Sequence, residues 1–69
     1  MAHLVPPVTI KRYAHQRLYA PAGGRYVTLE DLAGMVEDEE FFVVRDAASG
    51  EDLTPSILKQ IIIERARHG

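Results

Sequence analysis

Hydrophobic and polar residues alternate in the segment that follows the two prolines near the N-terminus. In residues 8–13, Val8 and Ile10 fall on one side of an extended chain and polar side chains fall on the other. Two more β-forming runs, Arg17–Tyr19 and Arg25–Thr28, flank a proline and a pair of glycines, which are typical of a turn. The pattern therefore predicts a strand followed by a β-hairpin.

At Thr28 the spacing of apolar residues changes to that of an α-helix. Its apolar face comprises Leu29, Leu32, Ala33 and Val36. Thr28 and Asp31 stand at the spacing of a capping box, in which each side chain accepts a hydrogen bond from the backbone N–H of the other residue. Four acidic residues at 37–40 oppose the negative end of the helix dipole, so the helix is expected to end near Asp38.

A strand and a helix are predicted again in the second half of the chain. The continuous apolar run Phe41–Val44 predicts a strand that is buried on both faces at the centre of the sheet. After a polar turn that begins at Arg45, a short strand is expected between Gly50 and Thr54. Thr54 with Pro55 provides the cap and the first turn of a second helix. Its core stripe comprises Ile57, Leu58, Ile61 and Ile62. We therefore expect an α+β fold of order strand, hairpin, helix, strand, strand, helix.

The length of 69 residues predicts a single domain, residues 8–69, after a flexible lead at residues 1–7. A core this small commonly needs a disulfide, a metal or a second subunit. The chain has no cysteine, and its three histidines, at positions 3, 15 and 68, are too far apart to predict a zinc site. We expect no metal and no cofactor, and a homodimer as the remaining support.

A dimer interface is predicted on the second helix. Ile63 lies about 100° round the helix from Ile62, which makes the apolar surface wider than a small core needs. The predicted interface residues are Ile57, Ile61, Ile62 and Ile63.

Charge is segregated along the chain, although the net charge is only −2. Every charged residue up to Leu29 is basic, and the acidic residues all follow from Glu30 onward. The first segment thus has four positive charges, from Lys11, Arg12, Arg17 and Arg25. This segregation predicts a basic face for a nucleic acid or, as the alternative, cations that protect the edge of a sheet.

Several other classes of function are disfavoured. The N-terminus has no basic region followed by an apolar stretch, and no run of about 18 apolar residues occurs, so we expect a cytoplasmic protein without a membrane span. No phosphate loop, dinucleotide fingerprint, serine elbow or cysteine nucleophile is present. The paired carboxylates lie in predicted surface turns. We therefore expect no enzymatic activity.

The basic segment contains the residue types that contact nucleic acids. Lysine and arginine bind phosphates, arginine and glutamine can bind base edges, and tyrosine can stack or donate a hydrogen bond. The predicted DNA-contacting residues are Lys11, Arg12, Tyr13, His15, Gln16, Arg17, Tyr19 and Arg25. Their place on strands and a turn favours a β-ribbon that contacts double-stranded DNA. For the tyrosines, the alternative is a place at the rim of the core.

The same segment resembles the N-terminal DNA-binding domain of the polyhydroxyalkanoate synthesis repressor family. The resemblance covers nearly all of residues 10–64 and rests on Ile10–Tyr13, Arg17–Tyr19, Arg25–Leu32, Phe42–Ala47, Ser49–Thr54, Leu58 and Gln60–Ile62. It implies a cytoplasmic bacterial transcriptional regulator of polyhydroxyalkanoate accumulation whose module binds promoter DNA. Family members usually continue into a C-terminal region implicated in granule or partner contact.

The chain departs from the pattern of that family in two places. It has Ala14–Gln16 before Arg17, where the family typically has Pro-Asn-Arg, and Ala20-Pro21 where the family has Asp-Thr. One cation and one polar side chain that could contact a base are therefore missing. The second hypothesis is accordingly a non-enzymatic protein-interaction or dimerisation adaptor that has kept the fold and lost DNA binding.

Overall fold

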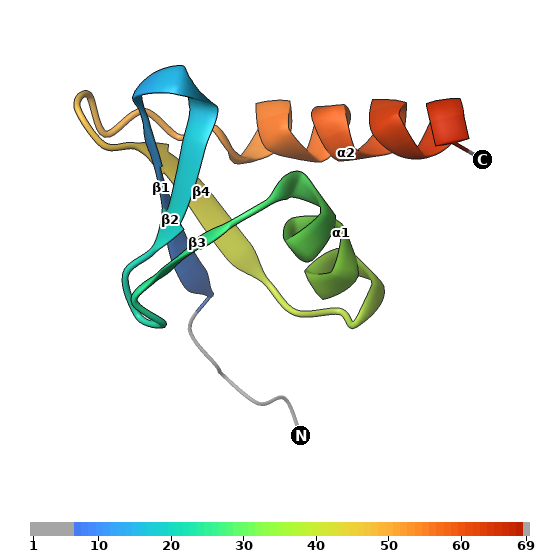
Figure 1. Cartoon of the computed structure of the whole chain (residues 1–69), viewed down its shortest axis with the longest axis horizontal. Coiled ribbons are helices and arrows are strands. Elements are labelled where there is room, and N and C mark those ends of the chain that lie inside the picture. The colour runs from blue at the N-terminus through green and yellow to red at the C-terminus, as the bar shows by residue number, and fades with distance from the viewer. Residues whose placement is uncertain (1–6, 69) are drawn as a thin grey trace.

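The computed structural model describes residues 7–68, which contain one four-stranded sheet and two α-helices (Figure 1). The strands are β1 (Val8–Tyr13), β2 (Arg17–Ala20), β3 (Arg25–Val27) and β4 (Phe42–Asp46), and the helices are α1 (Leu29–Glu37) and α2 (Thr54–His68). A 3₁₀ turn, Ala14–Gln16, joins β1 to β2. The predicted α+β class is confirmed, whereas the predicted lead at residues 1–7 lies outside the described residues except for Pro7.

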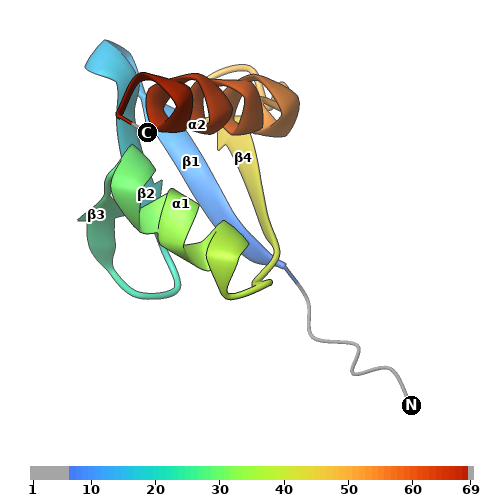
Figure 2. The ribbon, with the colours of Figure 1, turned by 90° about the vertical axis from the view of Figure 1, so that its right-hand side faces the viewer.

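The sheet has the strand order β3-β2-β1-β4. β1, β2 and β3 form an antiparallel meander, and β4 pairs with β1 in parallel after the chain has crossed over through α1. Figure 2 shows that α1 and α2 both lie on one face of this sheet. No element of residues 7–68 covers the opposite face, so the two faces of each strand have different surroundings.

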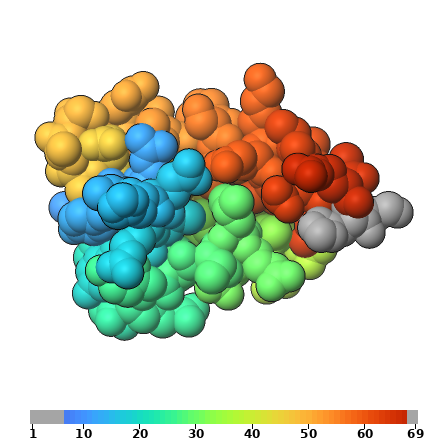
Figure 3. Space-filling view, turned by 45° about the horizontal axis from the view of Figure 1, so that its top comes forward, coloured from blue at the N-terminus to red at the C-terminus, as the bar shows by residue number. Residues whose placement is uncertain are grey.

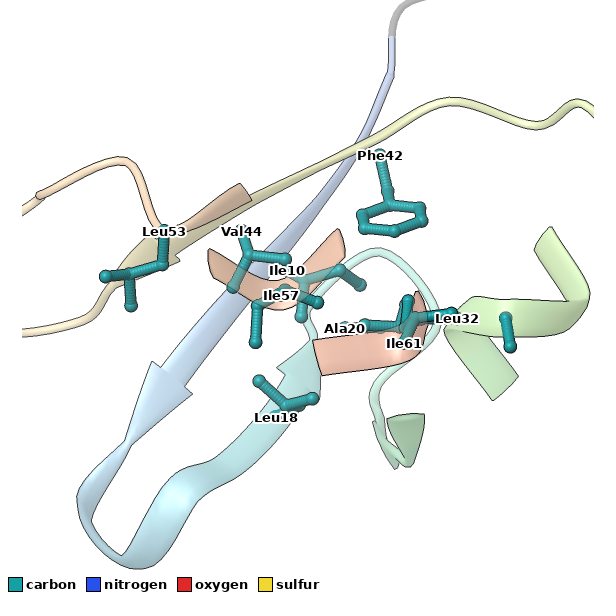
Figure 4. Close-up of a cluster of buried hydrophobic side chains, with 10 residues drawn as sticks. Ile10, Leu18, Ala20, Leu32, Phe42, Val44, Leu53, Ile57 and Ile61 are labelled. Atoms are coloured by element: carbon teal, nitrogen blue, oxygen red, sulfur yellow. The ribbon is translucent and has the colours of Figure 1, made fainter. Parts of the chain in front are cut away.

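The core lies between the sheet and the helices (Figure 4). It comprises Ile10, Leu18, Ala20, Leu32, Ala33, Phe42, Val44, Leu53, Ile57 and Ile61. The largest fully buried side chains, Ile10, Leu32 and Val44, come from β1, α1 and β4. Because strands contribute alternate residues and helices contribute every third or fourth residue, this core follows from the two periodicities of the sequence.

The limits of α1 follow from the chemistry of its two ends. The Asp31 N–H donates to Thr28 Oγ1 at 3.1 Å and the Thr28 N–H donates to Asp31 Oδ2 at 2.9 Å, so the predicted capping box is confirmed. The pKa of Asp31 lies below its ordinary value, chiefly because its carboxylate accepts the hydrogen bond from the Thr28 N–H. The positive charge of Arg25 lowers this pKa further. The helix ends at Glu37 with Asp38 as its C-cap, as the acidic run predicts.

The prediction for residues 41–44 is wrong in two respects. β4 lies at an edge of the sheet and not at its centre, because after the crossover it pairs with β1 on the outer side of the meander. Phe42 and Val44 are buried, but Val43 is half-buried and Phe41 precedes the strand with 76% of its surface exposed. Since the helices cover one face only, a continuous apolar run here does not have two buried faces.

The second strand predicted before α2 does not form. The segment makes only an isolated bridge between Arg45 and Asp52. The turn ends at Gly50, which has a φ of 80°, and α2 already begins at Thr54, so too few residues remain for a ladder. Thr54, predicted to cap α2, instead accepts a hydrogen bond at Oγ1 from the Val44 N–H, at 2.8 Å. This contact joins the start of α2 to the edge of β4.

Candidate nucleic-acid interface

We call the face of the sheet turned away from the helices the open face. It comprises the strand residues that alternate with those facing the helices: Thr9, Lys11, Tyr13, Arg17, Tyr19, Tyr26, Val43 and Arg45. Lys11 lies opposite Tyr19, and Tyr19 lies opposite Tyr26. These positions hold three cations and no carboxylate, in a chain whose net charge is −2. Positive charge is thus concentrated on the open face, to which the basic N-terminal segment contributes Lys11 and Arg17 and the acidic half of the chain contributes Arg45.

Three tyrosines form a continuous row across the open face. The ring centroids of Tyr13 and Tyr19 lie 6.4 Å apart and those of Tyr19 and Tyr26 lie 5.1 Å apart, with interplanar angles of 74° and 65°. Edge-to-face contacts of this kind stabilise the row. Tyr13 is 45% exposed and Tyr26 is 57% exposed, and neither faces the helix-covered core. The alternative place at the rim of that core therefore does not describe them.

Two of the predicted cations, Lys11 and Arg17, lie on interior strands of the open face. The guanidinium carbon of Arg17 lies 5.5 Å from the centroid of the Tyr26 ring, in a cation–π contact. Arg45, on β4, is the third cation, and its Nη1 donates to the Gly50 carbonyl at 3.1 Å. Protection of a sheet edge explains a cation on β3 or β4 but not on β1 or β2.

The other two predicted cations, Arg12 and Arg25, lie on the helix side of their strands. Both pair with β2 residues whose side chains are buried in the core. Arg12 Nη2 lies 3.3 Å from Asp46 Oδ2, so its charge is already paired. Arg25 acts electrostatically on Asp31, at the start of α1. The structure therefore does not bring these two arginines to the open face.

His15 and Gln16 form the tip of the β1–β2 hairpin. The space-filling view shows this blue-to-cyan hairpin beside the orange turn after β4 and the start of α2 (Figure 3). Both residues are exposed, and both have φ values in the left-handed region, 62° and 58°. Residues other than glycine adopt this region at a cost of about 1–2 kcal/mol each, and such strain is common at functional sites. The tip thus holds two polar side chains at one end of the sheet.

The four isoleucines predicted as a dimer interface divide between the core and the surface. Ile57 and Ile61 are buried in the core of the chain itself, whereas Ile62 and Ile63 are 68% and 48% exposed. We define the outward side of α2 by the exposed residues opposite its buried stripe, Ser56, Lys59, Ile62, Ile63 and Ala66. This side has a single charged residue and is the part of α2 that a second copy could contact.

Comparison with known protein families supplies the deciding observation. The family model described as the PHB/PHA accumulation regulator DNA-binding domain matches residues 9–69, which include nearly all of the sheet and both helices. The chain belongs to this family. The resemblance inferred from the sequence is thereby confirmed, and the family is one of regulatory DNA-binding domains, not of enzymes.

Two relatives match this PHB/PHA regulator domain over 60 residues, or 87% of the chain. One, 43% identical, is an uncharacterized protein in the phbA 5' region of Thiocystis violacea, and the other, 42% identical, is an uncharacterized protein of Allochromatium vinosum. The matched part is 44% and 39% of these proteins, so the chain spans less than half the length of either. No solved structure matches the chain. Within residues 7–68, neither helix is long and apolar enough to cross a membrane.

Among the aromatic and charged residues of the open face of the PHB/PHA regulator domain, Tyr26 and Arg45 were not predicted as contacts. Tyr26 has a signal in the sequence, because alternation along β3 places it on the side opposite the core-facing Val27. Arg45 was assigned to a polar turn, but β4 extends to Asp46. Its place on the open face depends on the parallel pairing of β4 with β1, which no local pattern gives.

Replacing His15 with Gly is expected to raise the free energy of unfolding of the PHB/PHA regulator domain by roughly 0.5–1 kcal/mol. Relief of about 1–2 kcal/mol of left-handed strain exceeds the chain-entropy cost of a glycine, about 0.5–1 kcal/mol. Urea unfolding followed by circular dichroism measures the change. The control is His15→Ala, which removes the same ring but keeps the strain. Equal stability of the two variants would contradict the prediction.

Proposed function

We propose that this chain is the DNA-binding part of a bacterial transcriptional regulator of polyhydroxyalkanoate accumulation, and that it holds double-stranded DNA against the open face of its sheet. The observation that carries the proposal is the composition of that face, with three cations, three tyrosines and no carboxylate among its strand positions. Membership of a DNA-binding family supports the choice of partner. A regulator of bacterial promoters acts in the cytoplasm, where the chromosome lies.

The open face suits a sheet that lies against a groove of duplex DNA. Lys11 and Arg17 extend from the two interior strands, where they can reach phosphates or base edges. The hydroxyl groups of the tyrosine row can donate further hydrogen bonds. His15 and Gln16, at the hairpin tip, offer donors and acceptors for base edges in the groove. The helices support the sheet from its other face.

We propose a second copy of the chain as the protein partner, bound through the outward side of α2. Two exposed isoleucines, Ile62 and Ile63, lie there beside the small residues Ser56 and Ala66 and a single charge, Lys59. An identical helix can pack against such a surface under two-fold symmetry, because the same patch serves both copies. A dimer also has two open faces, which can occupy two half-sites of one duplex.

One observation favours a second candidate function, a protein-interaction module without DNA binding. A groove of about 340 Å³ is lined by Val36, Glu39, Glu40, Phe41, Phe42, Thr54 and Leu58. Phe41 is 76% exposed and Val36 is 44% exposed, so the groove offers apolar surface to a segment of another protein. The salt dependence of duplex binding separates the two functions. The affinity of a DNA-binding domain for a duplex falls as the salt concentration is raised, whereas an adaptor shows no such salt-dependent affinity.

Lys11→Ala is expected to weaken the binding of all duplexes about equally. It should also reduce the slope of log K against log salt concentration by about one for each bound copy, because each copy loses one phosphate contact. The control is Arg67→Ala, which removes one exposed cation from α2, outside the proposed dimer contact, and should leave the slope unchanged. Fluorescence anisotropy of a labelled duplex over a series of salt concentrations gives both slopes. Equal effects in the two variants, or a wild-type chain without salt-dependent affinity for any duplex, would refute the proposed function.

A further inference from the structure

The arginines differ in what holds their guanidinium groups. Arg12 and Arg65 are each paired with a carboxylate. Arg45 donates to a backbone carbonyl. Arg17 stands apart within residues 7–68, because it is held by an aromatic ring and has no carboxylate partner in that range. Its positive charge and its N–H donors are therefore available to a ligand.

The ring that holds Arg17 is itself held in place. Tyr26 lies directly opposite Tyr19 in the β2–β3 register, with ring centroids 5.1 Å apart. Tyr19 makes a second edge-to-face contact, with Tyr13, at 6.4 Å. The four side chains thus form a series of contacts across three strands that ends at a guanidinium group. Tyr13 and Tyr19 lie on the interior strands β1 and β2, so they support the ring of Tyr26, which lies on the edge strand β3, from the interior of the sheet.

A held guanidinium group suits one of the two kinds of DNA contact better than the other. A phosphate can be bound from many directions, by a flexible ammonium group as well as by a guanidinium group. Guanine presents O6 and N7 side by side, and the planar fork of an arginine can donate one N–H group to each of them when its orientation is right. A cation–π contact restricts the orientation of the fork and leaves its N–H groups free. Tyr26 thus reduces the side-chain entropy that Arg17 loses on binding.

We propose that Arg17 is the residue that recognises guanine in the major groove, and that Tyr26 is the positioning residue that orients it. This inference rests on the proposed function and deepens it, because it assigns sequence specificity to one pair of side chains on the open face. It implies that the preferred DNA site contains a guanine whose replacement is costly. Lys11, which has no such support, contributes affinity without this specificity.

The test compares sequence preference with affinity in wild type, Tyr26→Phe, Tyr26→Thr and Arg17→Lys. Wild type first selects preferred sites from short duplexes with randomised central positions, and each guanine of the selected duplex is then replaced in turn. Wild type and Tyr26→Phe, which keeps the ring face, should share a guanine whose replacement weakens binding about 5- to 150-fold. Tyr26→Thr and Arg17→Lys should lose that discrimination, whereas their salt slope for a duplex of unrelated sequence should stay at the wild-type value, because neither substitution changes the number of positive charges on the open face.

The possible results separate this inference from the proposed function. Wild-type discrimination in Tyr26→Thr shows that the ring does not orient Arg17, and wild-type discrimination in Arg17→Lys shows that the planar guanidinium fork is not what recognises the guanine; either result overturns the inference. Threonine is a good strand former and Tyr26 is 57% exposed, so Tyr26→Thr should lose its ring contacts but stay folded at the temperature of the binding measurements, as circular dichroism will show. A wild type that binds duplexes with a normal salt slope but selects no guanine overturns the inference alone. A wild type without affinity for any duplex overturns both.

Discussion

Replacement of Leu32 with Ala is expected to remove most of the folding stability of this domain. Leu32 is 0% exposed and lies where α1 meets the rest of the core. Truncation of such a leucine costs about 3–5 kcal/mol, because its transfer free energy is lost and a cavity remains. A single core in a chain below about 70–80 residues rarely supplies more than about 3–5 kcal/mol in total. The variant should therefore be largely unfolded without denaturant.

Leu58→Ala is the matched control for this prediction. It removes the same atoms from α2, at a position that is 38% exposed, so the loss of stability should be clearly smaller. Circular dichroism without denaturant shows whether Leu32→Ala is unfolded, and urea unfolding gives the free energies of unfolding of the wild type and of Leu58→Ala. Equal losses in the two variants would show that α1 does not close the core through Leu32.

Features that depend on residues close together in the sequence could be predicted from the sequence. The spacing of Thr28 and Asp31 gave the start of α1, and the acidic run after Val36 gave its end. The period of 3.6 residues assigned Leu32 to the core. In a helix or a turn the interacting groups are a few residues apart, so spacing alone determines much of the geometry.

The order of the strands could not be predicted in this way, because it depends on residues far apart in the sequence. An apolar run such as Phe41–Val44 fits a central strand or an edge strand next to a helix equally well. The parallel register of Val44 with Ile10 distinguishes them, and it results from the crossover through α1. The same register places Arg45 beside Lys11, which explains why this cation was missed.

The composition of the candidate site was predicted, whereas its division between two faces was not. Alternation along β1 separates Lys11 from Arg12, since successive side chains point to opposite faces. The charge of Arg12 is paired with that of Asp46, which is near in space but distant in sequence, so this pairing could not be predicted from local spacing. Backbone N–H groups of the turn after β4, with Arg12, hold the pKa of Asp46 below its ordinary value and keep it charged for this pair.

Ile63→Lys is expected to convert a dimer of this chain into monomers and to weaken duplex binding about a hundredfold or more. Ile63 is 48% exposed, so the fold should tolerate lysine there. Burial of an unpaired ammonium group between two helices is costly, so the proposed contact through α2 should be lost. In a dimer on two half-sites, binding of the second open face is intramolecular, and its loss removes an avidity gain of about 10²–10⁴.

Sedimentation of Ile63→Lys and of the control Ile63→Leu, which keeps an apolar side chain, measures the change in mass. The salt slope for a long duplex should fall by about half in the lysine variant, because one open face then contacts phosphates where two did before. A monomeric mass for both the wild type and the lysine variant would refute the dimer. If the wild type is a dimer and the monomeric lysine variant has the same salt slope, a single copy makes all the DNA contacts. Dimerisation through α2 then has a role other than DNA binding.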